Sequence, residues 1–256
     1  MSRALRRAAL ASALASAPLA AQGLASRVAA APSSGALQFT YAARPGLCGN
    51  GRTWYSMGGT SFYGSFDSDY TRMSTDQCVA GPVRVVLDIS DRTVVGLRTF
   101  VGPVPTDAAV INLGNYGTSA AADYLMSLAG SSEGRIGPQA LGAAMLADSV
   151  DLTDRLLGIA RDNARPLETR RSAVSALVSS PTSQSSKISE ALIGIARNEN
   201  ETQSLRQRAL SSLSRIGHGD GIPGLIQHVT HEEVLAVANK AGARLGTVIK
   251  GVVAKL

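Results

Sequence analysis

Apolar and polar residues alternate along the first third of the chain. Residues 37–41 (Leu-Gln-Phe-Thr-Tyr) alternate strictly, and residues 83–89 are β-branched and mostly alternating. A short polar turn follows, and residues 93–101 form a second β-rich run. Because alternation with a period of two is typical of strands, we predict a β-hairpin over 83–101 within a β-rich domain at 36–117.

From about residue 118 the apolar positions recur every three or four residues, which predicts amphipathic helices. Joints rich in Gly, Pro and Ser divide this stretch into pairs of helices. We therefore expect about four helical hairpins, with helices over 121–129 and 138–146, 152–160 and 167–178, 188–196 and 205–216, and 222–229 and 232–245.

One phrase of the helical region occurs twice. Residues 156–161 (Leu-Leu-Gly-Ile-Ala-Arg) return 36 residues later as 192–197 (Leu-Ile-Gly-Ile-Ala-Arg). Arg170, Ala173 and Leu177 return at the same offset as Arg206, Ala209 and Leu213. A period of this length is typical of stacked helical hairpins.

The second helix of each copy resembles that of a HEAT repeat, which typically reads apolar-Arg-x-x-Ala-x-x-x-Leu. Residues 169–177 and 205–213 carry this pattern, and 217–225 resemble the joint between two HEAT repeats. The likeness spans about residues 119–250 and is weaker in the outer two pairs. It implies an α-solenoid at 118–256, in which Arg170 and Arg206 bond the adjoining repeat or contact a partner.

The expected fold class is therefore α+β, with a small disulfide-linked β-rich N-terminal region followed by an α-solenoid of about four HEAT-like helical hairpins. In organisation the chain is similar to exported bacterial proteins that place a small disulfide domain before HEAT repeats.

The first residues indicate export. Residues 1–21 combine a basic start, a short apolar run and small residues before Gln22, which predicts a secretory signal peptide. The sequence leaves the Sec and twin-arginine routes open. Residues 22–35 are rich in Ala, Ser, Gly and Pro and predict a flexible leader. We expect a periplasmic or extracellular protein without a membrane span.

The charge of the chain gives no indication of nucleic-acid binding. The formal net charge is +6, and three arginines of this balance belong to the predicted signal peptide. The remaining excess of about +3 is too small for a nucleic-acid footprint.

The only two cysteines, Cys48 and Cys78, both lie in the first third of the chain. An isolated pair in an exported domain predicts a disulfide. The loop between them holds most of the aromatic residues, among them Trp54, Tyr55, Phe62 and Phe66. Two readings stay open, because these rings can fill the core of a small β-domain or form an exposed partner contact.

No catalytic constellation is evident in the sequence, so we expect no enzyme, no cofactor and no metal. The main hypothesis is a non-enzymatic interaction or scaffold module that binds a protein or peptide of undetermined identity. One alternative is a metal-dependent hydrolase or other enzyme that uses His228 and His231 or the 48–78 loop. Another is a structural component of the cell envelope. The sequence leaves the oligomeric state open.

Overall fold

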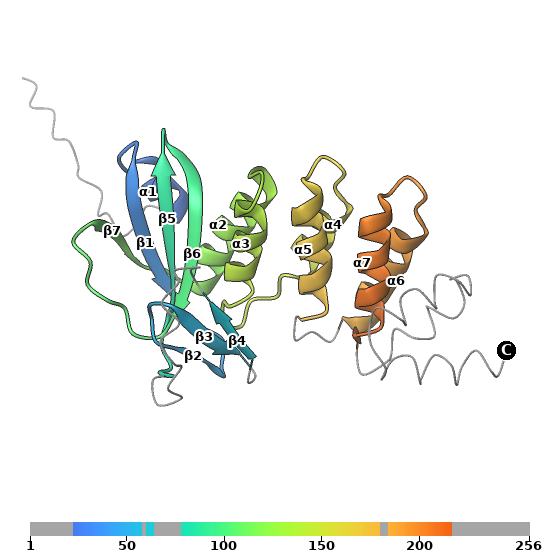
Figure 1. Cartoon of the computed structure of the whole chain (residues 1–256), viewed down its shortest axis with the longest axis horizontal. Helices are drawn as coiled ribbons and strands as arrows, with labels where there is room; N and C mark the ends of the chain where they lie inside the picture. Colours follow the sequence, from blue (N-terminus) through green and yellow to red (C-terminus); the bar gives the residue numbers. More distant parts are fainter. Residues whose placement is uncertain (1–22, 58–59, 64–77, 180–183, 217–256) are drawn as a thin grey trace, which may run out of the picture.

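The computed structural model describes residues 23–57, 60–63, 78–179 and 184–216. Two sheets lie at one end of the described chain, and pairs of helices extend away from them (Figure 1). The predicted signal peptide and the last predicted helical pair, at 222–229 and 232–245, lie outside these residues. Both therefore stay predictions.

The larger sheet has four strands: β1 (Gly35–Tyr41), β5 (Val83–Ser90), β6 (Thr93–Val101) and β7 (Val110–Asn115). Their order is β6-β5-β1-β7, with β7 parallel to β1 and the other neighbours antiparallel. The predicted strand at 37–41 and the hairpin at 83–101 are confirmed. Asp91 and Arg92 form the hairpin turn with φ of 49° and 62°, a left-handed geometry that matches the twist of the two strands.

The smaller sheet consists of β2 (Leu47–Gly49), β3 (Trp54–Met57) and β4 (Thr60–Tyr63), in that order. The predicted disulfide between Cys48 and Cys78 is confirmed and ties β2 to the chain that leads into β5. Beside it, Gly49 and Val79 exchange two backbone hydrogen bonds of 3.0 Å. The Gly51 N–H also donates to the Val101 carbonyl at 2.9 Å, which joins the small sheet to the end of β6.

The described helices after the sheet are α2 (Thr118–Ser131), α3 (Ile136–Ala144), α4 (Thr153–Arg161), α5 (Leu167–Leu177), α6 (Ser185–Arg197) and α7 (Gln203–Leu213). They follow one another as antiparallel pairs, and α3, α5 and α7 pack side by side (Figure 1). A further short helix, α1 (Leu24–Ala29), precedes β1. These helices confirm the expected pairs up to residue 216.

The residues that repeat in the sequence have equivalent surroundings in the structure. Leu156 and Leu192 are both fully buried, and so are Ala173 and Ala209. The Arg170 Nε donates to the Ala160 carbonyl at 3.1 Å, and the Arg206 Nε donates to the Ala196 carbonyl at 3.2 Å. Because Ala160 and Ala196 are themselves one repeat apart, the α4–α5 and α6–α7 pairs are two copies of one packing unit.

The prediction of an α-solenoid of about four HEAT-like hairpins behind a β-rich region is wrong. The described chain is a mixed α/β fold in which seven helices and the four-stranded mixed sheet share one hydrophobic core. The first pair, α2 and α3, packs on the sheet rather than forming a repeat of a solenoid. Tyr41 of β1, for example, is fully buried and donates from its hydroxyl to the Ala143 carbonyl of α3 at 2.6 Å.

The segment that the sequence assigns to a flexible leader contributes to this core. Within it, α1 buries Leu24, and the Arg27 guanidinium donates to the Leu113 carbonyl of β7. The composition of this segment is typical of a linker, whereas one leucine and one arginine are enough to anchor it against the sheet.

Candidate functional site

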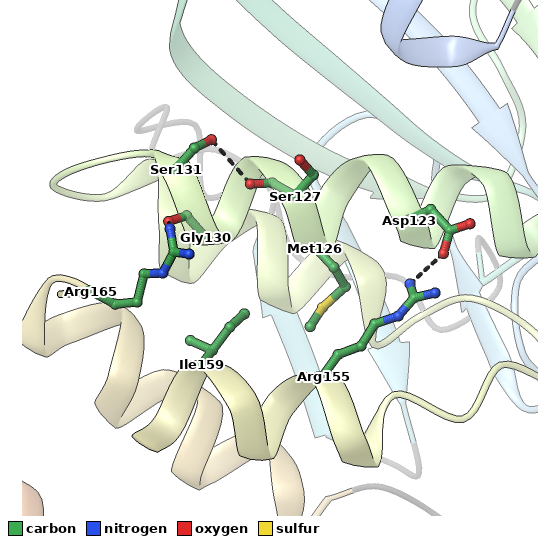
Figure 2. A pocket seen from close by; sticks show the side chains of 8 residues that line it. All are labelled: Asp123, Met126, Ser127, Gly130, Ser131, Arg155, Ile159 and Arg165. Atoms are coloured by element: carbon green, nitrogen blue, oxygen red, sulfur yellow. Dashed lines mark hydrogen bonds and ion pairs between the residues drawn. The ribbon is translucent and has the colours of Figure 1, made fainter. Parts of the chain in front are cut away.

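A groove of about 540 Å³ lies between α2 and α4, which we call the helical groove. Figure 2 shows the Met126 and Ile159 side chains facing each other across it. The Arg155–Asp123 ion pair closes one end, and Arg165 donates to the Gly130 carbonyl at the other. The groove therefore has an apolar floor between two bridging arginines.

The pattern of residues on the two helices explains why this groove forms. On α2, Ala121, Leu125 and Ala129 are fully buried in the core. Asp123 and Ser127 lie on the opposite, exposed side of the same helix and line the groove. Between α2 and α4 the contact is therefore bridged by polar side chains, while α3 packs directly on α5. Met126, which is 6% exposed, and the half-buried Ile159 fill this space only in part, so a groove remains.

Arg165 is held in place by a second carboxylate. Its Nε donates to the Asp162 Oδ2 at 2.7 Å. The Ala164 N–H also bonds Asp162, and these hydrogen bonds lower the pKa of the Asp162 carboxyl below its usual value. Since a guanidinium has five N–H donors, both Arg165 and Arg155 retain donors beyond the bonds they make to the described residues. The ends of the groove can therefore bond carbonyl or carboxylate oxygens of a bound molecule.

A second groove, of about 1060 Å³, runs between β6 and α3, and we call it the edge groove. Residues 93–99 of β6 form one wall, and Ile136, Gln139 and Gly142 of α3 lie on the other. Ser131, at the end of α2, lines both this groove and the helical groove. The two grooves therefore approach each other at the end of α2.

The aromatic residues of the disulfide-closed loop divide between core and surface. Trp54 is 7% exposed and belongs to the buried interior. Tyr55 is half-buried and lines the edge groove, and burial raises the pKa of its phenol. Phe62 lies opposite Tyr55 in the β3–β4 register, but the structure does not describe its side chain. Phe66 lies outside the described residues. Among the expected contact residues whose side chains the structure describes, Tyr55 lines a groove.

Arg170 and Arg206 are bonded within the helical layer. Arg170 and Glu201 form an ion pair in which each side chain is 6% exposed, and Arg170 also bonds the Ala160 carbonyl. Arg206 bonds the Ala196 carbonyl. Both bonds join the second helix of a pair to the end of its first helix. Neither arginine lines the helical groove or the edge groove.

The described residues contain no group of three or more His, Cys, Asp or Glu side chains arranged to hold a metal ion. Both cysteines of the 48–78 loop are consumed by the disulfide, so neither thiol is available as a ligand or nucleophile. His228 and His231 lie outside the described residues. Among the described helices, none is long and apolar enough to cross a bilayer.

Comparisons with family models, with curated proteins and with solved structures found no match to this chain. The resemblance to HEAT repeats therefore has no support beyond the two copies of the helical pair themselves. The grooves were not anticipated from the sequence. The sequence features that could have pointed to the grooves are a glycine and a methionine within the predicted helices, Gly142 and Met126.

Proposed function

We propose that the chain is an exported, non-catalytic module that binds another protein through the helical groove. The observation that carries this proposal is the placement of Met126 and Ile159 between the Arg155 and Arg165 bridges. Methionine and arginine are enriched at protein interfaces, and an unbranched thioether adapts to the shape of an incoming side chain.

The groove suits a side chain of a protein better than a small substrate. It is an open channel between two helices and not an enclosed cavity of the kind that buries most of a small ligand. An apolar side chain laid against Met126 and Ile159 would contribute about 1.5–3 kcal/mol if it were fully buried. Arg155 and Arg165 would bond the carbonyl or carboxylate oxygens that flank that side chain.

Two features support export. The disulfide between Cys48 and Cys78 is of a kind that persists in oxidising compartments. The predicted signal peptide at 1–21 gives a route to such a compartment. We therefore assign the protein to the periplasm or the extracellular space. Fractionation of the cells that make it tests this, since recovery of full-length, uncleaved protein in the cytoplasm would contradict the assignment.

The binding proposal is tested by photo-crosslinking in those cells. Ser127 is exposed and lines the helical groove, whereas Gln207 is exposed on α7 and lines neither groove. A photoreactive phenylalanine analogue is placed at one position or the other. We expect irradiation to attach one defined protein at position 127 and to leave position 207 without that adduct.

A variant links the adduct to the groove. Ile159→Glu places a charge on its floor, and Ile193→Glu makes the same change at a half-buried position of α6 outside the described grooves. The adduct should be lost in the first variant and kept in the second. If position 127 yields no adduct, or if both variants retain it, the helical groove is not the binding site.

A further inference from the structure

The outer edge of β6 carries backbone groups that point away from the sheet. In an antiparallel pair, successive residues direct their N–H and C=O groups alternately toward and away from the neighbouring strand. The Gly102 N–H donates inward to Pro82 at 3.2 Å, and the Val101 carbonyl accepts outward from Gly51 at 2.9 Å. These two bonds fix the alternation, so Thr99 and Leu97 direct their backbone groups outward.

The residues that carry these outward groups lie at the edge groove. Among the described strands, β5 alone pairs with β6. No described backbone or side-chain group bonds the N–H or C=O of Leu97 or Thr99. Both residues line the groove. Val95, which sits where the β5–β6 register shifts, is 58% exposed beside them. Unpaired strand edges of this kind accept another strand.

The opposite wall of the groove is open around one residue of α3. Gly142 of α3 lines the groove, and a Cβ at this position would meet no atom within 4 Å. Ile136 and Ala143 lie on the same wall. Residues 93–99 span about 23 Å at 3.3 Å per residue, which is the length of a peptide of about seven residues.

We propose that the edge groove binds an extended segment of a partner protein, which adds to β6 as a further strand. The N–H and C=O groups of Leu97 and Thr99 form the ladder, as in other cases of strand addition to an open sheet edge. Every second side chain of the segment points toward Ile136, Gly142 and Ala143 and is apolar. The alternate side chains lie over the Asp88–Arg98 ion pair and are polar.

This inference rests on the proposed function and describes how the partner is engaged beyond the helical groove. Because Ser131 lines both grooves, one partner can place a side chain between α2 and α4 and continue as a strand along β6. The two contacts use different residues, so each can fail while the other stands.

The test uses a phage-displayed library of random linear seven-residue peptides, selected against the full mature chain with its disulfide intact. We expect selected peptides in which apolar residues recur at every second position. Amide exchange of the isotope-labelled chain is then measured with a synthetic selected peptide. The Leu97 and Thr99 amides should exchange at least about tenfold more slowly with the peptide bound, since each becomes hydrogen-bonded.

Two variants test the ladder and the wall separately. Thr99→Pro removes an outward N–H without removing a β5–β6 bond, which a strand edge tolerates. Gly142→Leu fills the groove from α3. Each should weaken peptide binding at least about tenfold. Gly194→Leu is the matched control, because Gly194 is also an exposed helical glycine at which a Cβ would meet no atom within 4 Å. It should leave the affinity unchanged.

Several results would overturn the inference. They are a failure to select peptides, selected peptides without alternation, unchanged Leu97 and Thr99 exchange, or equal affinity of Gly142→Leu and Gly194→Leu. A second copy of the chain as the natural occupant would appear as a concentration-dependent dimer that Thr99→Pro abolishes, and it would also overturn it. If the position-127 adduct forms while the peptide tests on Leu97, Thr99 and Gly142 fail, the proposed function is retained and the added strand is removed.

Discussion

Arg170 and Arg206 occupy equivalent positions in the two copies of the helical pair, yet we predict unequal effects when each is replaced. Both donate from Nε to a carbonyl at the end of the preceding helix. Arg170 also forms an ion pair with Glu201, and the two side chains are each 6% exposed. Arg170→Met therefore leaves a buried carboxylate without its partner, whereas Arg206→Met is made at a half-buried position.

The magnitudes follow from burial. Removing one partner of a buried ion pair costs about 3–5 kcal/mol, because the remaining charge stays desolvated. At the half-buried Arg206 the groups that the guanidinium bonds keep access to water, so replacing it costs about 1–2 kcal/mol. At roughly 2–4 °C per kcal/mol for a chain of this size, Arg170→Met should lower the Tm by about 6–20 °C and Arg206→Met by about 2–8 °C.

The assay is urea unfolding followed by circular dichroism, together with a thermal scan. The double variant Arg170→Met/Glu201→Leu supplies the control, because it removes both charges at once. It should recover at least about 2 kcal/mol relative to Arg170→Met alone. The reasoning is refuted if Arg170→Met costs no more than Arg206→Met, or if the double variant is less stable than Arg170→Met.

Three further outcomes can be checked on the purified chain. Cys48→Ser with Cys78→Ser should lower the unfolding free energy by about 3–4 kcal/mol, since the disulfide closes a loop of 30 residues; unfolding in urea with and without reductant measures this, and equal midpoints would contradict it. Gly142→Ala should stabilise α3 by up to about 1 kcal/mol, because a Cβ there would meet no other atom within 4 Å. Gly137→Ala in the same helix should destabilise the chain, because the added Cβ would lie 2.2 Å from the buried Thr169 Oγ1. Thermal scans in which the two variants shift the Tm in the same direction would contradict this packing. Burial raises the pKa of Tyr124 to about 12, so its contribution to stability is present below the unfolded pKa of about 10 and is lost as the pH rises toward 12; Tyr124→Phe should reduce the fall in urea midpoint between pH 9 and pH 11, and an unchanged fall would contradict this.

Local features of the fold could be predicted from the sequence where neighbouring residues alone determine the structure. The β5–β6 hairpin follows from two β-branched runs around a polar turn. The disulfide follows from an isolated cysteine pair in a chain with a predicted signal peptide. The second helices of the repeated pairs follow from Ala173 and Ala209, which are small because helices approach closely there.

Long-range packing could not be predicted in the same way. The apolar face of α2 is made of small residues such as Ala121 and Ala129, which suit a sheet as well as another helix, so the pattern did not say what it covers. The prediction of a solenoid was wrong because it treated α2 and α3 as a further copy of the repeated helical pair. Strand β7 pairs with β1 in parallel across most of the β-rich region, and its exposed Ile111 obscures the alternation.

The candidate site was anticipated only in part for the same reason. Tyr55 was singled out because it belongs to an aromatic-rich loop, and it does line the edge groove. The helical groove depends on Arg155 and Arg165 reaching across to α2, which no local pattern encodes. Arg170 stood out through its recurrence, whereas recurrence here marks a packing position.

The most direct test of the central claim is hydrogen exchange of the mature chain alone and in complex with the protein captured at position 127. The account predicts slower exchange in the last turns of α2 around Met126 and Gly130 and in β6 at Leu97 and Thr99. Exchange in α7 should stay the same. Protection confined to α6 and α7, or no change in α2, would contradict the assignment of the two grooves as the binding surface.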